Sequence, residues 1–557
     1  MNQETKNCKK CQKDFILEID DFSFYEKMKV PIPKMCPDCR FKMRAIFRNE
    51  RTLYNQSCKL CGESVITMYH PNSPYTVYCN DCYLSDKWDP YSYAIDYDPR
   101  RPFFEQLKEL VERVPKSATY SSVSTGVNIN SEYANFAGGN KDGYLIFNCG
   151  PNNENIAYSR GLIDSKDTYD CYYGDELENT YEGVNVHKSN GVVWGQNISD
   201  TLDSRFILNC PGDQNYFCCV NLPHKSYYFF NQPLSRDEWL SKVSEISGSY
   251  SKVEEIKKEF EEFSLKFPRR PNNNLKATNC TGDYIFESKN CHDCFELSFC
   301  EDMRYCFSVK RAKDCMDMIG HCRRSELLYN GVGVGANSQK VICSWWVESS
   351  QDVEYSFATR RSNNCLGTDG VTGGNFVILN KKYSKENYNE IKKQIIQELK
   401  DKDVYGDFFP REMAFFAYNE TIAQDNMPLS REEILAQGFR WEDNIQKTEG
   451  KGTLQSEDIP DHIKDVTNDI LKEVLTCIKC SRNYILIERE LTFYRKMNIS
   501  IPRICWNCRF VDRIHRRGSY KFWNRTCAKC QKEIITNYAP DRPEIVYCEK
   551  CYQQEVY

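Results

Sequence analysis

Eight cysteine pairs of the form CxxC are the residues in this sequence best suited to chemistry. Four pairs lie near the N-terminus: Cys8/Cys11, Cys36/Cys39, Cys58/Cys61 and Cys79/Cys82. Four more lie near the C-terminus: Cys477/Cys480, Cys505/Cys508, Cys527/Cys530 and Cys548/Cys551. In both sets 24, 18 and 17 residues separate successive pairs. The shared spacing indicates that the chain carries one module twice.

A CxxC pair places two thiolates close enough to share a tetrahedral Zn²⁺, and a second pair completes a four-cysteine shell. The sixteen cysteines therefore predict four zinc ions, two in each module. Four protein ligands leave no open position for a catalytic water, so we expect structural sites. We favour pairing of successive CxxC pairs, with a cross-brace arrangement as the alternative. A redox-active thioredoxin-like motif, the other chemistry open to CxxC, is typically a single pair.

The overall composition is that of a multidomain globular protein. The chain has 557 residues, of which 40% are hydrophobic and 27% charged, and its mean hydropathy is −0.66. That length predicts several cores rather than one. No apolar run approaches the length of a membrane span, and no apolar stretch follows the charges of MNQETKNCKK, as it would in a secretory signal. Thirty cysteines without an export signal indicate metal ligands or reduced thiols, so we expect a cytoplasmic protein.

The first half of each module resembles the probable zinc-ribbon family of treble-clef type. The two copies read CKKCQKDFILEI…FSFYEKMKVPIPKMCPDCR and CIKCSRNYILIE…LTFYRKMNISIPRICWNCR. The family pattern is CxxC, an aromatic strand, an FY-containing turn, a proline and then CPxCR opening a helix. Arg40 and Arg509 match its arginine, whereas Trp506 stands where the family has proline. The second half, CKLCGESVITMYHPNSPYTVYCNDCY, predicts a hairpin between two knuckles.

A basic run follows the second CxxC pair of each module. Arg40, Arg44 and Arg48 recur at helical spacing, as do Arg509, Arg513 and Arg517, joined by Arg516 and Lys521. Residues 475–557 carry 16 Lys+Arg against 8 Asp+Glu, and residues 1–90 carry 14 against 12, so the middle of the chain is acidic. Guanidinium groups pair well with phosphate, so these eight side chains are candidate nucleic-acid contacts. The alternative is that the arginines pack onto the acidic body of the same chain.

The middle of the chain contains short strand-like stretches and a recurring cysteine. Cys280, Cys300, Cys322, Cys343 and Cys365 are 20 to 22 residues apart, and Asn or Asp precedes many of the cysteines. Short strands at a fixed period near 21 residues predict a parallel β-solenoid. The pattern occurs twice, and each copy is followed by a serine that opens a helix, with Ser235 and Glu238 as one capping box.

We therefore predict a mainly β fold: two parallel β-solenoid segments with capping helices, flanked by N- and C-terminal treble-clef zinc-ribbon modules. The predicted segments are a double zinc-ribbon module (1–90), a helical linker (91–118), solenoid half 1 (119–232), a helical cap and connector (233–274), solenoid half 2 (275–381), a helical cap (382–447), a linker (448–474) and a second double zinc-ribbon module (475–557).

Taken over its whole length, the chain resembles a set of uncharacterised proteins from small-genome candidate-phylum bacteria. The resemblance rests on the duplicated module, the repeating N-C and D-C dipeptides, the ILNKKYSKENY element and the GFRW stretch at 438–441. It implies zinc ribbons and no particular activity.

The sequence favours a non-enzymatic zinc-binding protein that binds nucleic acid, RNA or DNA, through its basic treble-clef helices. The first alternative is a scaffold for protein partners, in which the zinc modules are purely structural. The second is a carbohydrate-active β-helix enzyme that uses the acidic residues Asp175, Glu176, Glu178 and Glu182. We expect no membrane partner.

Overall fold

The chain folds into two compact units that do not follow chain order. The computed structural model describes residues 3–121, 125–445 and 447–557. Unit 1 combines Met1–Ser124 with Asn274–Ile445, and unit 2 combines Thr125–Asn273 with Gln446–Tyr557. The N-terminal cysteine-rich module thus shares a unit with the second strand-rich segment, and the C-terminal module with the first. Within the described ranges, no helix has the length and apolarity needed to cross a bilayer.

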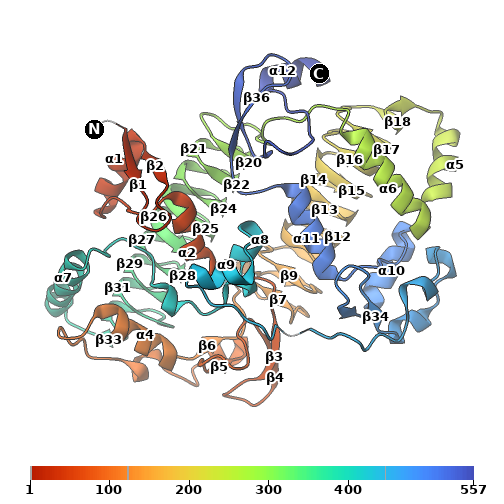
Figure 1. Ribbon diagram of the computed structural model, residues 1–557. Helices are drawn as coiled ribbons and strands as arrows, with labels where there is room; N and C mark the ends of the chain where they lie inside the picture. Colours follow the sequence, from red (N-terminus) through yellow and green to blue (C-terminus); the bar gives the residue numbers. More distant parts are fainter. Residues whose placement is uncertain (1–2, 122–124, 446) are drawn as a thin grey trace. The chain divides into compact units, whose positions relative to one another are not determined.

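Each unit is built on one large β-sheet of short, parallel strands, so the fold is mainly β with helices, as predicted (Figure 1). We call the sheet of unit 2 the first ladder and that of unit 1 the second ladder. The first ladder comprises β7 (Ala134–Asn135), β8 (Asn140–Lys141), β9 (Ile146–Phe147), β10 (Asn153–Ala157), β11 (Arg160–Ile163), β12 (Lys166–Tyr169), β13 (Tyr172–Tyr181), β14 (Val184–Asn190), β15 (Val193–Ser199), β16 (Arg205–Leu208), β17 (Gln214–Val220), β18 (Ser226–Phe229) and β19 (Gln232–Pro233). The second ladder comprises β20 (Gly282–Phe286), β21 (Lys289–His292), β22 (Cys294–Ser298), β23 (Glu301–Arg304), β24 (Phe307–Lys310), β25 (Ala312–His321), β26 (Ser325–Val332), β27 (Gln339–Ile342), β28 (Trp345–Glu348), β29 (Gln351–Glu354), β30 (Phe357–Arg360), β31 (Asn363–Leu366), β32 (Asn375–Ile378) and β33 (Lys381–Lys382).

Paired residues in both ladders lie twelve positions apart along the chain. In the first ladder Arg160 pairs with Tyr172 and Tyr172 with Val184; in the second Val341 pairs with Val353 and Val353 with Cys365. The exceptions are thirteen residues long: β8–β10 and β9–β11 in the first ladder, and β25–β26, β26–β27 and β26–β28 in the second. The predicted period near 21 residues is therefore wrong.

The inward-facing positions explain why the cysteine spacing was misleading. Core residues of the second ladder recur at every third position, as in Cys291, Cys294, Leu297, Cys300 and Met303. Cys300, Cys322 and Cys365 belong to this core, whereas Cys343 lies at a positive-φ position outside it, so the spacing of these cysteines does not report the repeat. Many of the inward thiols donate to ladder carbonyls, for example Cys291 Sγ to Lys289 O at 3.3 Å. They behave as small core residues with a satisfied donor.

The residue before each inward position has a left-handed backbone. Asn148, Asp170, Asn209, Asp293 and Asp314, each followed by a cysteine, have φ between 51° and 54°. Asn and Asp adopt this conformation at lower cost than most residues, because their short polar side chains can hydrogen-bond locally. This requirement accounts for the N-C and D-C dipeptides of the sequence.

A helix follows the antiparallel last strand of each ladder. These helices are α5 (Arg236–Ile246), continued by α6 (Tyr250–Ser264), in unit 2 and α7 (Lys385–Asp401) in unit 1. Ser235 and Glu238 form the predicted capping box at the start of α5. Trp239 Nε1 donates to Tyr228 O at 3.2 Å, which fixes α5 against β18. Two further helices of unit 1 are α8 (Ile422–Asn426) and α9 (Arg431–Ala436).

The two cysteine-rich modules, predicted to bind zinc, contain matching elements. In unit 1 these are β1 (Glu4–Asn7), β2 (Asp14–Leu17), α1 (Ile19–Met28), α2 (Pro37–Ala45), β3 (Tyr54–Ser57), β4 (Ser64–Thr67), β5 (Val77–Tyr78) and α3 (Asn80–Leu84), followed by α4 (Phe103–Arg113) and β6 (Lys116–Ser117). In unit 2 they are β34 (Leu475–Thr476), β35 (Asn483–Tyr484), α10 (Glu488–Met497), α11 (Trp506–Arg517), β36 (Trp523–Thr526), β37 (Glu533–Thr536) and α12 (Glu549–Val556). The predicted basic helices are α2 and α11.

Candidate metal centres and a buried arginine cluster in each unit

The sixteen cysteines of the modules gather into four groups of four, each formed by two successive CxxC pairs. The groups are Cys8/Cys11/Cys36/Cys39, Cys58/Cys61/Cys79/Cys82, Cys477/Cys480/Cys505/Cys508 and Cys527/Cys530/Cys548/Cys551. Within each group the sulfur atoms lie within 4.8 Å of one another. The predicted sequential pairing is confirmed, and the cross-brace alternative is wrong.

The sulfur distances fit a tetrahedral metal site. Cys11 and Cys36 Sγ are 3.6 Å apart, Cys480 and Cys505 3.7 Å, and Cys477 and Cys508 3.8 Å. A regular tetrahedron with metal–sulfur bonds of about 2.3 Å has edges of about 3.8 Å. Four thiolates in this geometry suit Zn²⁺, which would be held by protein ligands alone.

Backbone N–H groups favour the thiolate form at the first cysteine of each group. Cys58 is an example: burial raises the pKa of its thiol, but N–H groups of Cys61, Cys79 and Leu60 lower it to about 6. One of these donors, Cys79 N, lies 3.2 Å from Cys58 Sγ. Cys79 also begins helix α3, just as Cys36, Cys505 and Cys548 begin α2, α11 and α12. Helix N-termini favour negative charge, which stabilises ligating thiolates.

The arginines of α2 lie buried against the second ladder. Arg40 is 3% exposed, and Arg44 and Asp317 are fully buried. Arg40 Nε donates to Asp317 Oδ2 at 2.7 Å, and Arg44 Nη2 lies 3.1 Å from Asp317 Oδ1. Arg44 Nη1 also donates to Asn330 Oδ1 at 3.1 Å. One ladder carboxylate therefore holds two successive turns of the module helix.

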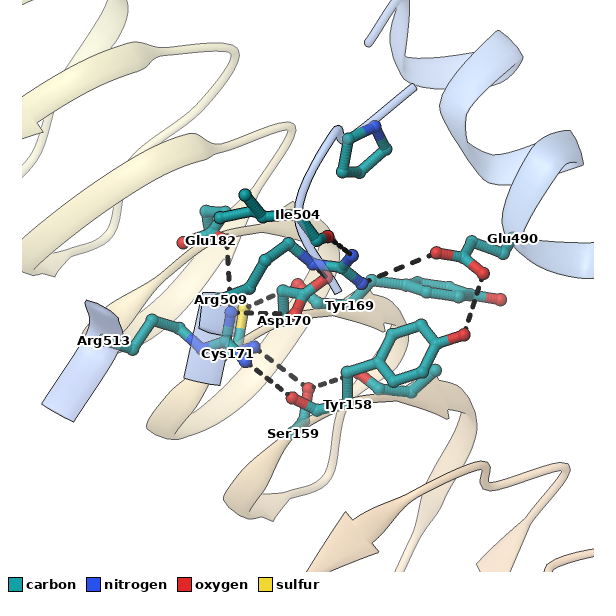
Figure 2. Close-up of polar contacts among 12 residues, drawn as sticks. Tyr158, Ser159, Tyr169, Asp170, Cys171, Glu182, Glu490, Ile504, Arg509 and Arg513 are labelled. Atoms are coloured by element: carbon teal, nitrogen blue, oxygen red, sulfur yellow. Dashed lines mark hydrogen bonds and ion pairs between the residues drawn. The ribbon is translucent and has the colours of Figure 1, made fainter. Parts of the chain in front are cut away.

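The same arrangement occurs in unit 2, where α11 meets the first ladder (Figure 2). Arg509 Nε donates to Asp170 Oδ2 at 2.9 Å, and Arg513 Nη1 lies 2.8 Å from Asp170 Oδ1. Arg513 also pairs with Glu182 at 3.2 Å and donates from Nη2 to Tyr158 O at 2.9 Å. Arg513 and Asp170 are fully buried. We refer to these two sites as the arginine clusters.

The positive-φ residues just before the inward positions form the corners of each ladder. Corner residues one twelve- or thirteen-residue step apart stack into a column, and both arginine clusters use one such column. The column is Tyr158, Asp170, Glu182, Trp194 and Phe206 in the first ladder, and Tyr305, Asp317, Asn330, Cys343 and Tyr355 in the second, all with positive φ. Side chains at these corners point outward, so the module helix lies along a single column.

A second buried acid completes each cluster from the helix that precedes the metal-binding turn. In unit 1 it is Asp21 of α1, 3.1 Å from Arg304. In unit 2 it is Glu490 of α10, which accepts from Tyr158 and Tyr494 at 2.8 and 2.6 Å. Burial raises the pKa of both carboxyls, and the nearby arginines oppose this effect. Both acids occupy the third position of their helix, so they also serve its capping box.

The other predicted phosphate contacts differ in exposure. Arg48 (1% exposed) pairs with Glu50 at 2.7 Å, and Arg517 (4%) donates to the Tyr172 hydroxyl at 2.7 Å. Arg516 bonds the carboxylate of Glu182 at 2.8 Å and covers the ring of Trp194 at 4.4 Å. Lys521 is exposed, with its ammonium 5.5 Å from the ring of Trp523.

These positions agree with the alternative interpretation of the basic helices as an intramolecular interface. Seven of the eight candidate side chains are engaged with acidic, hydroxyl or carbonyl groups of their own unit, and Lys521 alone among the eight is exposed. Sequence reasoning did not identify the acidic partners Asp21, Asp317 and Glu490. It noted Asp170 only as a residue before a cysteine, and Glu182 only as a possible catalytic acid.

Three of the four acidic residues of the carbohydrate-cleavage alternative contact other polar side chains. Glu182 forms ion pairs with Arg513 and Arg516, and Asp175 forms a hydrogen bond with the His187 ring on the next step of the ladder. Glu178 accepts from Asn190 at 3.2 Å. These contacts follow the column pattern of the ladder.

Neither a protein-family model nor a curated protein sequence matches the chain. The resemblance to zinc ribbons and to candidate-phylum bacterial proteins stays a prediction.

Proposed function

We propose that the protein is a non-enzymatic, zinc-dependent scaffold, built from two β-solenoids that are each braced by a double zinc-ribbon module. The observation that carries this proposal is the pair of arginine clusters. Each joins the metal-binding turn of a module to the middle of a ladder through fully buried charges. Breaking such a pair leaves an uncompensated buried charge, at a cost of about 3–5 kcal/mol. The module is therefore part of the unit's core rather than a mobile appendage.

The register of the ladders supports the solenoid part of the proposal. Successive parallel steps of twelve residues, with a corner at every third position, describe a coil with four short sides. Inward residues of successive coils then form the continuous apolar core found in each ladder. A coil cannot bury its own apolar side chains alone, so the stack needs closure at its ends and bracing along its sides.

Nucleic-acid binding through α2 and α11 receives less support. Phosphate contact by Arg40, Arg44, Arg509 or Arg513 would require these side chains to leave buried carboxylates, at the cost given above. A nucleic-acid surface would instead have to centre on exposed residues such as Lys521. In the scaffold proposal the outward faces of the ladders bind a protein partner. The zinc ions stabilise the modules, and the modules in turn stabilise the ladders.

Hydrogen exchange on the full-length zinc-loaded protein tests the scaffold proposal. Chelating the metal should remove protection from ladder amides beside the arginine clusters, such as those of β11 and β13, before it affects β17. Ladder protection that is unchanged by chelation would contradict the proposal.

Fluorescence anisotropy separates it from the nucleic-acid alternative. Single-stranded RNA and duplex DNA at two salt concentrations should show no salt-sensitive binding. Salt-sensitive binding that is lost in Lys521→Glu, but kept in the exposed control Lys532→Glu, would favour nucleic acid instead.

A further inference from the structure

In unit 1 the chain fills the groove between its zinc module and the second ladder with residues 403–407. Lys34 of the module forms an ion pair with Asp403. The Gly406 carbonyl accepts from Asn330 Nδ2 at 3.1 Å, and its N–H donates to the Tyr355 hydroxyl at 2.7 Å. A β-carbon on Gly406 would lie 3.3 Å from Pro31. The backbone of this segment therefore packs closely against the module, and Asp403 neutralises the charge of Lys34.

Unit 2 has a cavity of about 220 Å³ at the corresponding place. Arg503 stands two residues before a metal-binding CxxC pair, as Lys34 does in unit 1. Trp194 and Phe206 stand in the corner column where unit 1 has Cys343 and Tyr355. The remaining wall comes from α6, including Tyr250 and Val253.

Two arginines line this cavity without a carboxylate partner. Arg503 is 4% exposed, and its Nη2 donates to Ile459 O at 2.8 Å while its Nη1 has no hydrogen-bond partner. Arg205 Nη2 donates to Met497 O at 2.5 Å. Neither guanidinium forms an ion pair with any residue in the described part of the chain. Burial lowers the pKa of Arg205 to about 10, with Asp203 opposing, and burial also lowers the pKa of Arg503.

The acidic residues that line the cavity are already paired. Glu182 is held by Arg513 and Arg516, Asp512 lies 2.5 Å from Lys479, and Glu254 lies 3.7 Å from Lys257. In unit 1 the ladder residue at the position of Arg205 is Glu354, which is neutralised by Lys392 at 2.6 Å. Unit 2 thus has two cations without an ion-pair partner among the described residues, the buried Arg503 and the partly buried Arg205, where unit 1 pairs Lys34 with Asp403 and Lys392 with Glu354.

We propose that this cavity of unit 2 binds a small organic anion, with a carboxylate directed to Arg205 and Arg503 and an apolar, planar body against Trp194 and Phe206. Guanidinium groups bind carboxylates through two parallel hydrogen bonds, and aromatic walls suit a planar body. A cavity of about 150 Å³ already holds benzene, so this one has room for a benzoate or indole carboxylate. The proposal goes beyond the scaffold function, since a scaffold needs no small ligand.

Isothermal titration of the full-length zinc-loaded protein tests the proposal with defined probes. Benzoate and indole-3-acetate should bind saturably at one site per chain, and the neutral probes benzamide and indole at least tenfold more weakly. A lost charged hydrogen bond corresponds to roughly ten- to hundredfold weaker binding, which we expect for Arg205→Met and Arg503→Met. Arg236→Met, at an exposed arginine of α5, should bind like the wild type.

A second variant keeps the test valid if an arginine substitution impairs folding. Val253→Phe leaves both arginines in place and should abolish binding by filling the cavity. Zinc content and the unfolding midpoint report whether each variant is folded. Absence of saturable binding by either anion overturns the proposal, as does binding that Arg503→Met and Val253→Phe leave unchanged.

Discussion

The buried carboxylate of the unit 2 arginine cluster offers the most direct test of how the cysteine-rich modules are held against the ladders. Asp170 is fully buried and bonds two guanidinium groups, from Arg509 at 2.9 Å and from Arg513 at 2.8 Å. Asp170→Asn keeps the size and shape of the side chain but removes its charge. Two buried guanidinium groups then share a neutral amide, with Glu182 and Glu490 as their remaining anionic neighbours.

The expected loss of stability follows from the burial of the pair. Removing one partner of a buried ion pair costs about 3–5 kcal/mol, because the other charge stays desolvated. Since all three side chains are at most 3% exposed, solvent screening does not reduce this cost. In a folding unit of this size, one kcal/mol shifts the midpoint by about 2–4 °C, so unit 2 should melt roughly 6–20 °C lower.

Hydrogen exchange with mass spectrometry can assign the effect to one unit. In Asp170→Asn, protection should fall in β11–β15 and α11, while β25–β30 and α2 keep theirs. Asp317→Asn should show the reverse pattern, because Asp317 plays the same part for Arg40 and Arg44. Asp237→Asn, at an exposed position of α5, is the matched control and should be neutral.

A combined variant separates lost charge balance from lost packing. Replacing the four buried charges of the cluster together, as Asp170→Leu, Glu490→Gln, Arg509→Met and Arg513→Met, leaves none of them unpaired and should recover much of the stability. A loss below about 1 kcal/mol in Asp170→Asn, or equal loss of protection in both units, would refute the reasoning.

Three other predictions address the metal, the corners and pH. Elemental analysis should find four zinc ions per chain; Cys58→Ser should lower the count by one, whereas Cys300→Ser, at an inward ladder position, should leave it at four. Asn215 lies at a corner with φ of 58°, so Asn215→Val should lower the free energy of unfolding by about 1–2 kcal/mol, measured by thermal unfolding. Asn215→Gly, and Gln214→Val at the neighbouring exposed position, should cost much less. Equal losses in the three variants would contradict the corner assignment. Burial raises the pKa of Asp213 to about 8. The folded state therefore keeps a proton that the unfolded state has lost, so stability should fall by about 1.4 kcal/mol per pH unit between roughly pH 4 and 8. Asp213→Asn should flatten that dependence, and an unchanged slope in chemical denaturation would show that another group is responsible.

The four groups of cysteines that could hold metal ions could be predicted from the sequence, because the cysteines of such a site lie at fixed short spacings along the chain. Two cysteines in one CxxC turn and a fixed distance to the next pair are sufficient to define each shell. The helices that follow Cys36 and Cys505, and the helix at 251–263, were predictable for the same reason: caps and helical periodicity involve only near neighbours. The ladder was predictable as a parallel repeat, but its step was not.

The acidic half of each arginine cluster could not be predicted, because one residue type serves two purposes in the ladders. Corners favour Asn and Asp for their left-handed backbone, so Asp170 and Asp317 look like any of the other corner residues. What distinguishes them is position: each follows a tyrosine, Tyr158 or Tyr305, one coil earlier on the same column, and that column faces an arginine-bearing helix. The sequence shows the column only once the twelve-residue step is known. It also cannot say which module serves which ladder, because both modules offer the same arginines and both ladders the same aspartate. The choice is left to contacts outside the shared pattern, such as Glu182 with Arg516 in unit 2 and Asn330 with Arg44 in unit 1.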